Sequence, residues 1–157
     1  MSCRMFIHGL ESTNQGTKAV FFRENYPGMI TPHFTGPLDE RMEKLKTVLS
    51  DQQGITLVGS SFGGLMASIF ALESEGRMKS LILLAPAINL MPCMPCSERK
   101  TGVPTWIYHG KQDDVIDIGE VQRVAEKVFS NLRFHAVDDD HFLHKTFKTL
   151  PWDRLLS

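Results

Sequence analysis

Residues 55–72 read ITLVGSSFGGLMASIFAL, and this stretch decides the fold. The nearly unbroken apolar run at residues 55–58 predicts a buried strand, and residues 62–72 have the composition of a helix. Between them, residues 59–63 form a G-x-S-x-G pattern, which in this setting is typical of a nucleophile elbow. Because such a turn holds a serine hydroxyl above the edge of a sheet, Ser61 is the predicted nucleophile. A glycine-rich turn that serves only packing is the alternative.

Outward from this turn, strand-like and helix-like segments alternate along the chain, which is typical of a parallel sheet with helices on both faces. The expected strands are residues 3–8, 29–35, 55–60, 79–85, 104–109 and 132–137, and the expected helices are residues 16–25, 39–52, 62–75, 117–130 and 143–149. Pro32 lacks the N–H that a sheet ladder needs, so the second strand is expected at an edge. The sequence predicts a single α/β domain over residues 1–157, a three-layer sandwich with a six-stranded, mainly parallel sheet.

The composition favours a small substrate. Of the 157 residues, 42% are apolar and 22% are charged, and the formal net charge of −1 provides no field that would attract nucleic acid or an anionic membrane. The N-terminus has too short an apolar run for a signal peptide, and no stretch approaches the roughly 20 apolar residues of a membrane span. Three cysteines cannot all pair with one another, which suits a reducing compartment. We therefore expect a cytoplasmic protein.

Cys93 and Cys96 form a C-x-x-C pair. A metal or redox role for such a pair needs further ligands or a supporting context, and no second Cys or His pair at zinc spacing accompanies it in the sequence. The preferred interpretation is a flexible loop, with no metal and no cofactor in the predicted site.

A serine nucleophile needs a carboxylate and a histidine, which in strand–elbow–helix folds follow in the order Ser, Asp or Glu, His. The first carboxylates after the fifth expected strand are Asp113 and Asp114. Successive side chains point in different directions, so only one of them should reach a histidine. Asp113 is preferred, because Asp114 could instead begin the following helix. A solvated turn is the alternative for the pair.

His141 follows the last expected strand, at the edge where open α/β sheets place their sites. It is the predicted general base. His144 is a less favoured alternative because it falls about one turn further along the next expected helix, and His109 has the position of a core or strand-end histidine. The acidic residues 138–140 before His141 are expected to form a solvated loop that could raise the pKa of the imidazole.

Acyl transfer also needs two donors for the oxyanion. Phe62 N–H is one candidate, because it lies at the first turn of the helix after Ser61. Leu10 N–H is the other, because Gly9 lets the backbone turn at the end of the first strand. His8 is expected to hold this loop as a structural residue.

Four motifs follow one another along the chain: H-G at residues 8–9, G-x-S-x-G at residues 59–63, H-G-x-x-D at residues 109–113 and D-H at residues 140–141. Together they resemble the α/β-hydrolase superfamily over essentially the whole chain. Residues 8–12, 18–19 and 59–64 are similar to the small, lidless bacterial esterases of the YqiA type.

This resemblance implies a minimal α/β-hydrolase fold with Ser61, Asp113 and His141 as the triad and Leu10 and Phe62 as the oxyanion donors. Relative to the full superfamily, the first two strands look absent, and no cap is inserted at residues 86–103. The sequence departs from the family in its three aspartates before the histidine, where glycines are common.

The predicted reaction is hydrolysis of a small carboxylic ester through an acyl-enzyme. The side chains expected to contact the substrate are Leu10, Phe62, Leu90, Met91, Met94 and Phe142, which suggest a short, apolar acyl chain or an aryl ester. The same residues could serve a thioesterase or a peptidase. A binding module that keeps only the fold is a rival, although it would have no need of a base and an oriented carboxylate.

Overall fold

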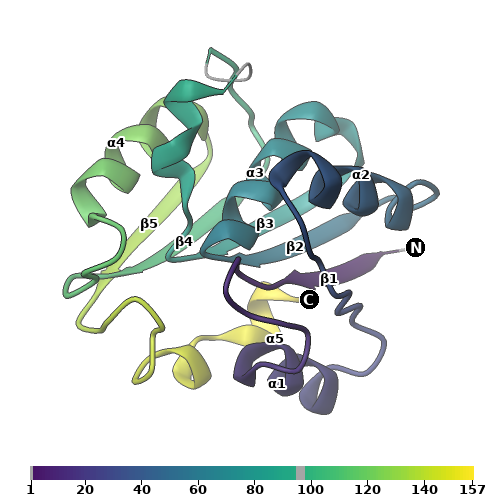
Figure 1. Ribbon diagram of the computed structural model, residues 1–157, viewed down its shortest axis with the longest axis horizontal. Helices are drawn as coiled ribbons and strands as arrows, with labels where there is room; N and C mark the ends of the chain where they lie inside the picture. The colour runs from purple at the N-terminus through teal and green to yellow at the C-terminus, as the bar shows by residue number, and fades with distance from the viewer. Residues whose placement is uncertain (1, 95–97) are drawn as a thin grey trace.

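A five-stranded sheet forms the centre of the computed structural model, which describes residues 2–94 and 98–157 (Figure 1). The strands are β1 (Cys3–Ile7), β2 (Ile55–Ser60), β3 (Met78–Leu84), β4 (Thr105–Gly110) and β5 (Leu132–Val137). They lie side by side in the order in which they follow in the chain, and every neighbouring pair is parallel. All five carboxyl ends therefore meet at one edge of the sheet.

The prediction of a sixth strand over residues 29–35 is wrong. Within this segment only Ile30 pairs with the sheet, through a single parallel bridge to Met5. The N–H of Ile30 donates to the Arg4 carbonyl at 2.9 Å, and its own carbonyl accepts from Phe6 N–H at 2.9 Å. Two residues later Pro32 has no N–H to continue the ladder. The segment lies beside the edge strand, as the proline suggested, but it does not become a strand.

The helices cover both faces of the sheet (Figure 1). One face carries α2 (Leu38–Val48), α3 (Phe62–Glu73) and α4 (Ile118–Val128), and the other carries α1 (Thr17–Asn25) and α5 (Trp152–Leu155). The described residues also form three 3-10 turns: η1 (Glu75–Arg77), η2 (Ile88–Cys93) and η3 (Phe147–Thr149). Among the described residues, no helix combines the length and the apolar character that crossing a membrane requires.

The helix predicted over residues 143–149 does not form. In place of a helix over residues 143–149, the chain forms only η3 and then α5. Leu143 has a left-handed backbone with a φ of 54°, which is incompatible with a continuous right-handed helix. Pro151 then separates the two short elements, since it cannot donate a helical hydrogen bond.

Alternation along the strands divides the core into two clusters, one on each face. In β3, Leu81 and Leu83 face the α2, α3 and α4 side, whereas Ile82 and Leu84 face the α1 and α5 side. Both faces of the strand are covered here, which accounts for the unbroken apolar run over residues 81–84. Residues 63–72 of α3 are all buried, because this helix crosses the middle of the sheet.

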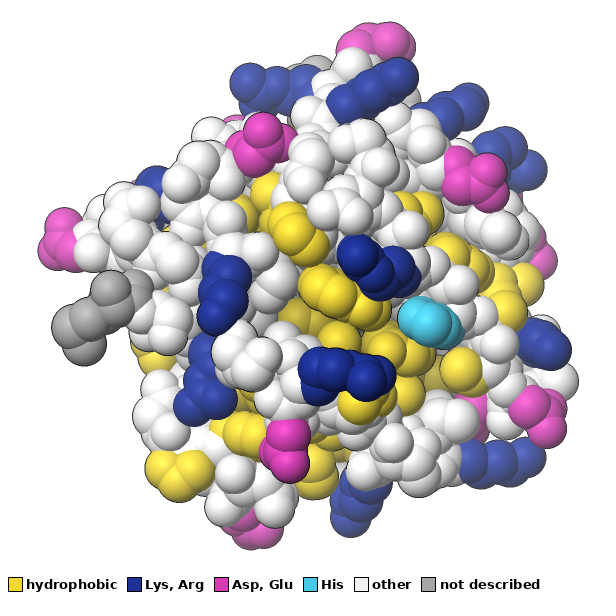
Figure 2. Space-filling view, turned by 180° about the vertical axis from the view of Figure 1, so that it is seen from behind, with side chains coloured by type: hydrophobic (Ala, Val, Ile, Leu, Met, Phe, Trp, Pro, Cys, Tyr) yellow, Lys and Arg dark blue, Asp and Glu magenta, His cyan; other side chains and the backbone are white. Residues whose placement is uncertain are grey.

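Basic side chains screen apolar surface on the face opposite the view of Figure 1. Figure 2 shows hydrophobic side chains there with Lys and Arg side chains lying across them. Arg133 and Arg4 lie over aromatic rings. The guanidinium carbon of Arg133 lies 4.9 Å from the ring centroid of Trp106, and that of Arg4 lies 5.9 Å from the ring centroid of Tyr26. Long basic side chains can cover apolar surface in this way while their charges stay in water.

Gly63→Ala should lower the free energy of unfolding by roughly 2–3 kcal/mol. A Cβ at this position would lie 2.7 Å from the His8 carbonyl oxygen and closer still to that of Ile7, so backbone would have to move. Urea denaturation monitored by circular dichroism measures the loss. Gly76→Ala is the matched control, since nothing lies within 4 Å of the added atom. Equal stability of the two variants would contradict the close approach of α3 to β1.

Candidate active site

The turn between β2 and α3 holds Ser61 in a strained backbone conformation. Its φ of 55° and ψ of −116° lie outside the regions that side-chain-bearing residues usually occupy. The N–H of Ser61 donates to the Leu84 carbonyl at 2.9 Å, which fixes the turn to the neighbouring strand. A Cβ on Gly59 would lie 2.8 Å from Gly64 Cα, so the glycine allows the turn to close. The side chain of Ser61 is thereby presented at the carboxyl edge of the sheet.

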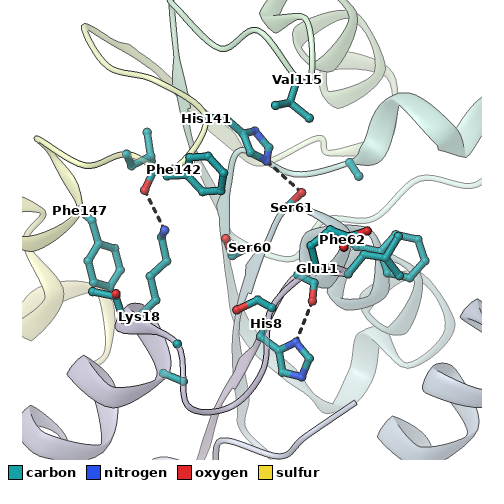
Figure 3. A pocket seen from close by; sticks show the side chains of 18 of the residues that line it. His8, Glu11, Lys18, Ser60, Ser61, Phe62, Val115, His141, Phe142 and Phe147 are labelled. Carbon is teal, nitrogen blue, oxygen red and sulfur yellow. Dashed lines mark hydrogen bonds between the residues drawn. The ribbon is translucent and has the colours of Figure 1, made fainter. Parts of the chain in front are cut away.

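Three side chains from separate loops form a chain of hydrogen bonds at this edge. The Ser61 hydroxyl oxygen lies 3.2 Å from His141 Nε2 (Figure 3). On the other side of the imidazole, His141 Nδ1 lies 2.7 Å from Asp113 Oδ2. An ionised carboxylate only accepts hydrogen bonds, so Nδ1 carries the proton and Nε2 is left to accept one from Ser61. The structure brings together the three residues that the sequence singled out for the triad.

Asp113, and not Asp114, reaches the histidine. The Asp113 side chain is fully buried, and its Oδ1 accepts hydrogen bonds from Val115 N–H and Ile116 N–H, both at 2.8 Å. Asp114 is exposed. It does not begin the next helix either, because Asp117 is the N-cap of α4 and accepts from Glu120 N–H at 3.1 Å. The turn thus holds one carboxylate in a single orientation.

The acidic loop before His141 is built differently from the predicted solvated loop. Asp139 is 3% exposed, and its Oδ2 accepts from Lys145 N–H, Thr146 N–H and the Thr146 hydroxyl. Burial alone would raise the pKa of Asp139, but hydrogen bonds from backbone N–H groups, first that of Asp140, hold it below its usual value. Asp139 therefore organises the loop on which His141 sits. The sequence gives no signal that Asp139 is the buried one, because nothing in the pattern distinguishes it from Asp138 and Asp140.

Asp140 turns His144 away from the serine. Its Oδ2 lies 2.6 Å from His144 Nδ1, and its Oδ1 accepts from Phe142 N–H at 3.1 Å. The hydrogen bond with His144 lowers the pKa of Asp140 to about 2. The His144 side chain is 72% exposed, whereas that of His141 is 8% exposed. Of the two histidines, only His141 faces Ser61.

The two predicted oxyanion donors flank Ser61. Phe62 is the first residue of α3, where N–H groups have no intrahelical acceptor. Leu10 follows Gly9, at which an added Cβ would lie 3.4 Å from Ser61 Cβ, so this loop runs directly beside the serine. Within the described part of the chain, no group accepts a hydrogen bond from either N–H. Both remain available to a ligand.

His8 holds the loop of Leu10 through both ring nitrogens. Its Nδ1 lies 2.8 Å from the Gly9 carbonyl, and its Nε2 accepts from Phe34 N–H at 2.9 Å. The carbonyl only accepts, so Nδ1 carries the proton. Burial lowers the pKa of His8, which favours this neutral form. The structural role expected of His8 agrees with these contacts.

A cavity of about 760 Å³ opens beside Ser61. The large hydrophobic side chains that are exposed among the described residues are Leu10, Leu90, Val115 and Phe142, and all of them line this cavity. Exposed apolar groups gathered at one place mark a surface that binds something apolar. Of the predicted substrate contacts, Leu10, Phe62, Leu90 and Phe142 line the cavity.

The structure does not bring Met91 and Met94, two of the expected substrate contacts, into the lining of the cavity. Met91 is 1% exposed and belongs to the core, and Met94 packs against the same cluster. The reason is η2, which the sequence did not predict: this 3-10 turn carries Ile88 and Met91 inward. Neither methionine is part of the lining that the structure describes.

Lys18, in the first turn of α1, connects this helix to the loop that carries His141. Its ammonium group donates to the Phe142 carbonyl at 2.8 Å (Figure 3) and lies 5.4 Å from the ring centroid of Phe147. Burial lowers the pKa of Lys18. The lysine thus fixes the residue next to His141, a contact across 124 positions of sequence that no local pattern indicates.

The described residues contain no group of three or more His, Cys, Asp or Glu side chains that could hold a metal ion. Cys93 is exposed at the end of η2. Its predicted loop partner Cys96 lies outside the described residues.

Comparison with known proteins agrees with this architecture. A family model described as the alpha/beta hydrolase fold matches residues 31–100, which include Ser61. No curated protein matches the chain. Among solved structures, Est1E from Butyrivibrio proteoclasticus is 16% identical with a TM-score of 0.77, covering 98% of this chain and 86% of that protein.

Two further solved structures are similar. Alpha/beta hydrolase domain-containing protein 10 from mouse is 18% identical with a TM-score of 0.76, covering 90% of this chain and 82% of that one. An alpha-beta serine hydrolase homologue from Coxiella burnetii is 20% identical with a TM-score of 0.76, covering 98% and 83%. At these identities the likeness establishes a shared fold.

Proposed function

We propose that this chain, which belongs to the α/β-hydrolase superfamily, is a serine hydrolase that cleaves carboxylic esters through an acyl-enzyme on Ser61. The observation that carries the proposal is the continuous chain of hydrogen bonds from Ser61 through His141 to the buried carboxylate of Asp113. A packing turn has no need of this arrangement, whereas a serine hydroxyl becomes a good nucleophile only when a base can take its proton.

The geometry supports the following sequence of steps. His141 Nε2 takes the hydroxyl proton as Ser61 Oγ attacks the ester carbonyl carbon, and Asp113 stabilises the imidazolium. The N–H groups of Leu10 and Phe62 donate to the oxyanion of the tetrahedral intermediate. The intermediate expels the alcohol, which leaves with the proton from His141. Water then attacks the acyl-enzyme with His141 as base, and release of the acid restores Ser61.

The cavity favours an apolar acyl group. Leu90, Val115 and Phe142 stand at its mouth, and no cap covers them in the described structure. Transfer of one methylene group from water into such a site contributes about 0.8 kcal/mol, or roughly fourfold in kcat/KM. We therefore propose a small-molecule ester with an apolar acyl chain as the substrate.

A series of p-nitrophenyl esters from acetate to decanoate tests this proposal. We expect kcat/KM to rise with each added methylene until the acyl chain fills the cavity, and then to level off. Release of p-nitrophenol at 405 nm as an initial burst would support the acyl-enzyme. Failure of the pure, folded protein to hydrolyse any member of the series would overturn the proposed activity.

Asp113→Asn should lower kcat on the order of 10³-fold or more while leaving the fold intact. The amide would offer its own N–H to His141 and favour the tautomer whose Nε2 bears the proton, so that no acceptor faces Ser61. Asp114→Asn is the matched control and should retain activity within about twofold, because Asp114 is exposed. Equal losses in both variants, with unchanged circular dichroism, would mean that the two carboxylates act jointly.

A further inference from the structure

We propose that His109, at the end of β4, is a positioning residue that holds the Asp113 carboxylate for His141. This inference rests on the proposed function. His109 Nε2 lies 3.1 Å from Asp113 Oδ2, the same oxygen that lies 2.7 Å from His141 Nδ1. The His109 side chain is fully buried, and nothing in the reaction steps above uses it. The carboxylate therefore lies between two histidines.

The contacts of His109 fix its protonation. Nε2 also lies 2.9 Å from the Ile116 carbonyl, which only accepts hydrogen bonds, so Nε2 carries a proton. Nδ1 is buried and has no hydrogen-bond partner among the described residues. Burial lowers the pKa of His109, against the opposing effects of the Ile116 carbonyl and Asp113. His109 is thus neutral: its single N–H donates to the Ile116 carbonyl, and the positive end of that N–H dipole lies beside Asp113 Oδ2.

With His109 included, four N–H groups surround the carboxylate. Val115 and Ile116 donate to Oδ1, His141 donates to Oδ2, and the Nε2–H of His109 lies beside Oδ2 with an N···O distance of 3.1 Å. The Ile116 carbonyl bonded to His109 belongs to the same short turn that supplies the two donors to Oδ1. His109 consequently acts twice on Asp113, once directly and once by anchoring the turn around it.

Loss of the His109 donor has a defined consequence for catalysis. Without the N–H dipole beside Oδ2, the negative charge of Asp113 is less neutralised and attracts the imidazolium form of His141 more strongly. The pH at which kcat/KM is half-maximal should therefore move upward. The charged or titratable groups that act on His109 are Asp113, His141 and Asp117, and all of these remain in place when only His109 is changed.

Three substitutions separate the direct contact from mere filling of space. In His109→Gln, the amide nitrogen can occupy about the position of Nε2 and can keep an N–H both on the Ile116 carbonyl and beside Asp113. In His109→Asn, the shorter side chain places the same amide near the position of Nδ1, where it cannot reach. His109→Leu fills the buried site without any donor.

The experiment measures kcat, KM and the pH profile of p-nitrophenyl butyrate hydrolysis for the wild type and these variants. We expect His109→Asn and His109→Leu to lose about tenfold in kcat with KM unchanged, and their half-maximal pH to rise by about half a unit. His109→Gln should stay within about twofold of the wild type and keep its pH profile. Urea denaturation of each variant serves as the control for folding.

Equal behaviour of the Gln and Asn variants would overturn the proposal, as would a rise in KM with an unmoved pH profile. The second result would assign His109 to the shape of the turn alone, since Val115 and Ile116 line the cavity. An inactive wild type would instead overturn the proposed function, so the two failures are distinguishable.

Discussion

Ser61→Ala is expected to remove essentially all ester hydrolysis, with kcat/KM falling on the order of 10⁴-fold or more. The loss follows from chemistry alone, because alanine keeps the Cβ and removes only the hydroxyl that attacks the carbonyl. Alanine meets the same strain as serine at a φ of 55°, so the turn should keep its shape. Initial rates with p-nitrophenyl butyrate, together with circular dichroism, measure both points.

Ser68→Ala is the matched control for this variant. Ser68 lies in α3, the helix that follows Ser61. It is fully buried, and its hydroxyl donates to the Gly64 carbonyl at 2.7 Å. Its replacement should leave kcat/KM within about threefold of the wild-type value. Hydrolysis by Ser61→Ala at a tenth of the wild-type rate or more would show that another group is the nucleophile.

His141→Ala is expected to lose on the order of 10³-fold or more in kcat. Without the imidazole, the Ser61 hydroxyl has no acceptor for its proton, and the buried charge of Asp113 loses one of its donors. The loss of that donor could also lower stability, so urea denaturation must accompany the kinetics. Activity at saturating ester concentration isolates the effect on kcat.

His144→Ala provides the comparison, because it removes a neighbouring histidine that faces Asp140 and solvent. Its kcat should remain within about twofold of the wild type. If the large loss came from His144→Ala and not from His141→Ala, the orientation of the whole loop after β5 would be wrong.

The elbow and its surroundings could be predicted from the sequence because their constraints are local. Gly59 and Gly63 are required where a Cβ would strike backbone atoms, and these requirements appear directly in the G-x-S-x-G pattern. The apolar runs of β2 and β3 likewise reflect burial on both faces of the sheet. The residues at the ends of parallel strands then meet at one edge, which is why Asp113 and His141 could be named together with Ser61.

The features that sequence reasoning missed depend on contacts between distant segments. A methionine such as Met91 suits a substrate cavity as well as a core. The 3-10 turn η2 directs its side chain into the core. Asp139 is buried because Thr146 and its neighbours return to bond it. The sequence predicts His109 to be a core or strand-end histidine, which agrees with its burial at the end of β4, but its contact with Asp113 requires the turn after β4 to fold back. Such contacts leave no periodic or spaced signal in the chain.

Covalent labelling of the wild-type protein by a fluorophosphonate, followed by peptide mapping in a mass spectrometer, tests directly whether Ser61 is an activated nucleophile. This reagent phosphonylates a serine whose hydroxyl is activated by a base, and it needs no knowledge of the natural substrate. We expect one adduct per chain, located on Ser61, with loss of ester hydrolysis in proportion to labelling. An adduct on Ser60 or Ser68, or full ester hydrolysis by a protein that the reagent does not label, would contradict this assignment.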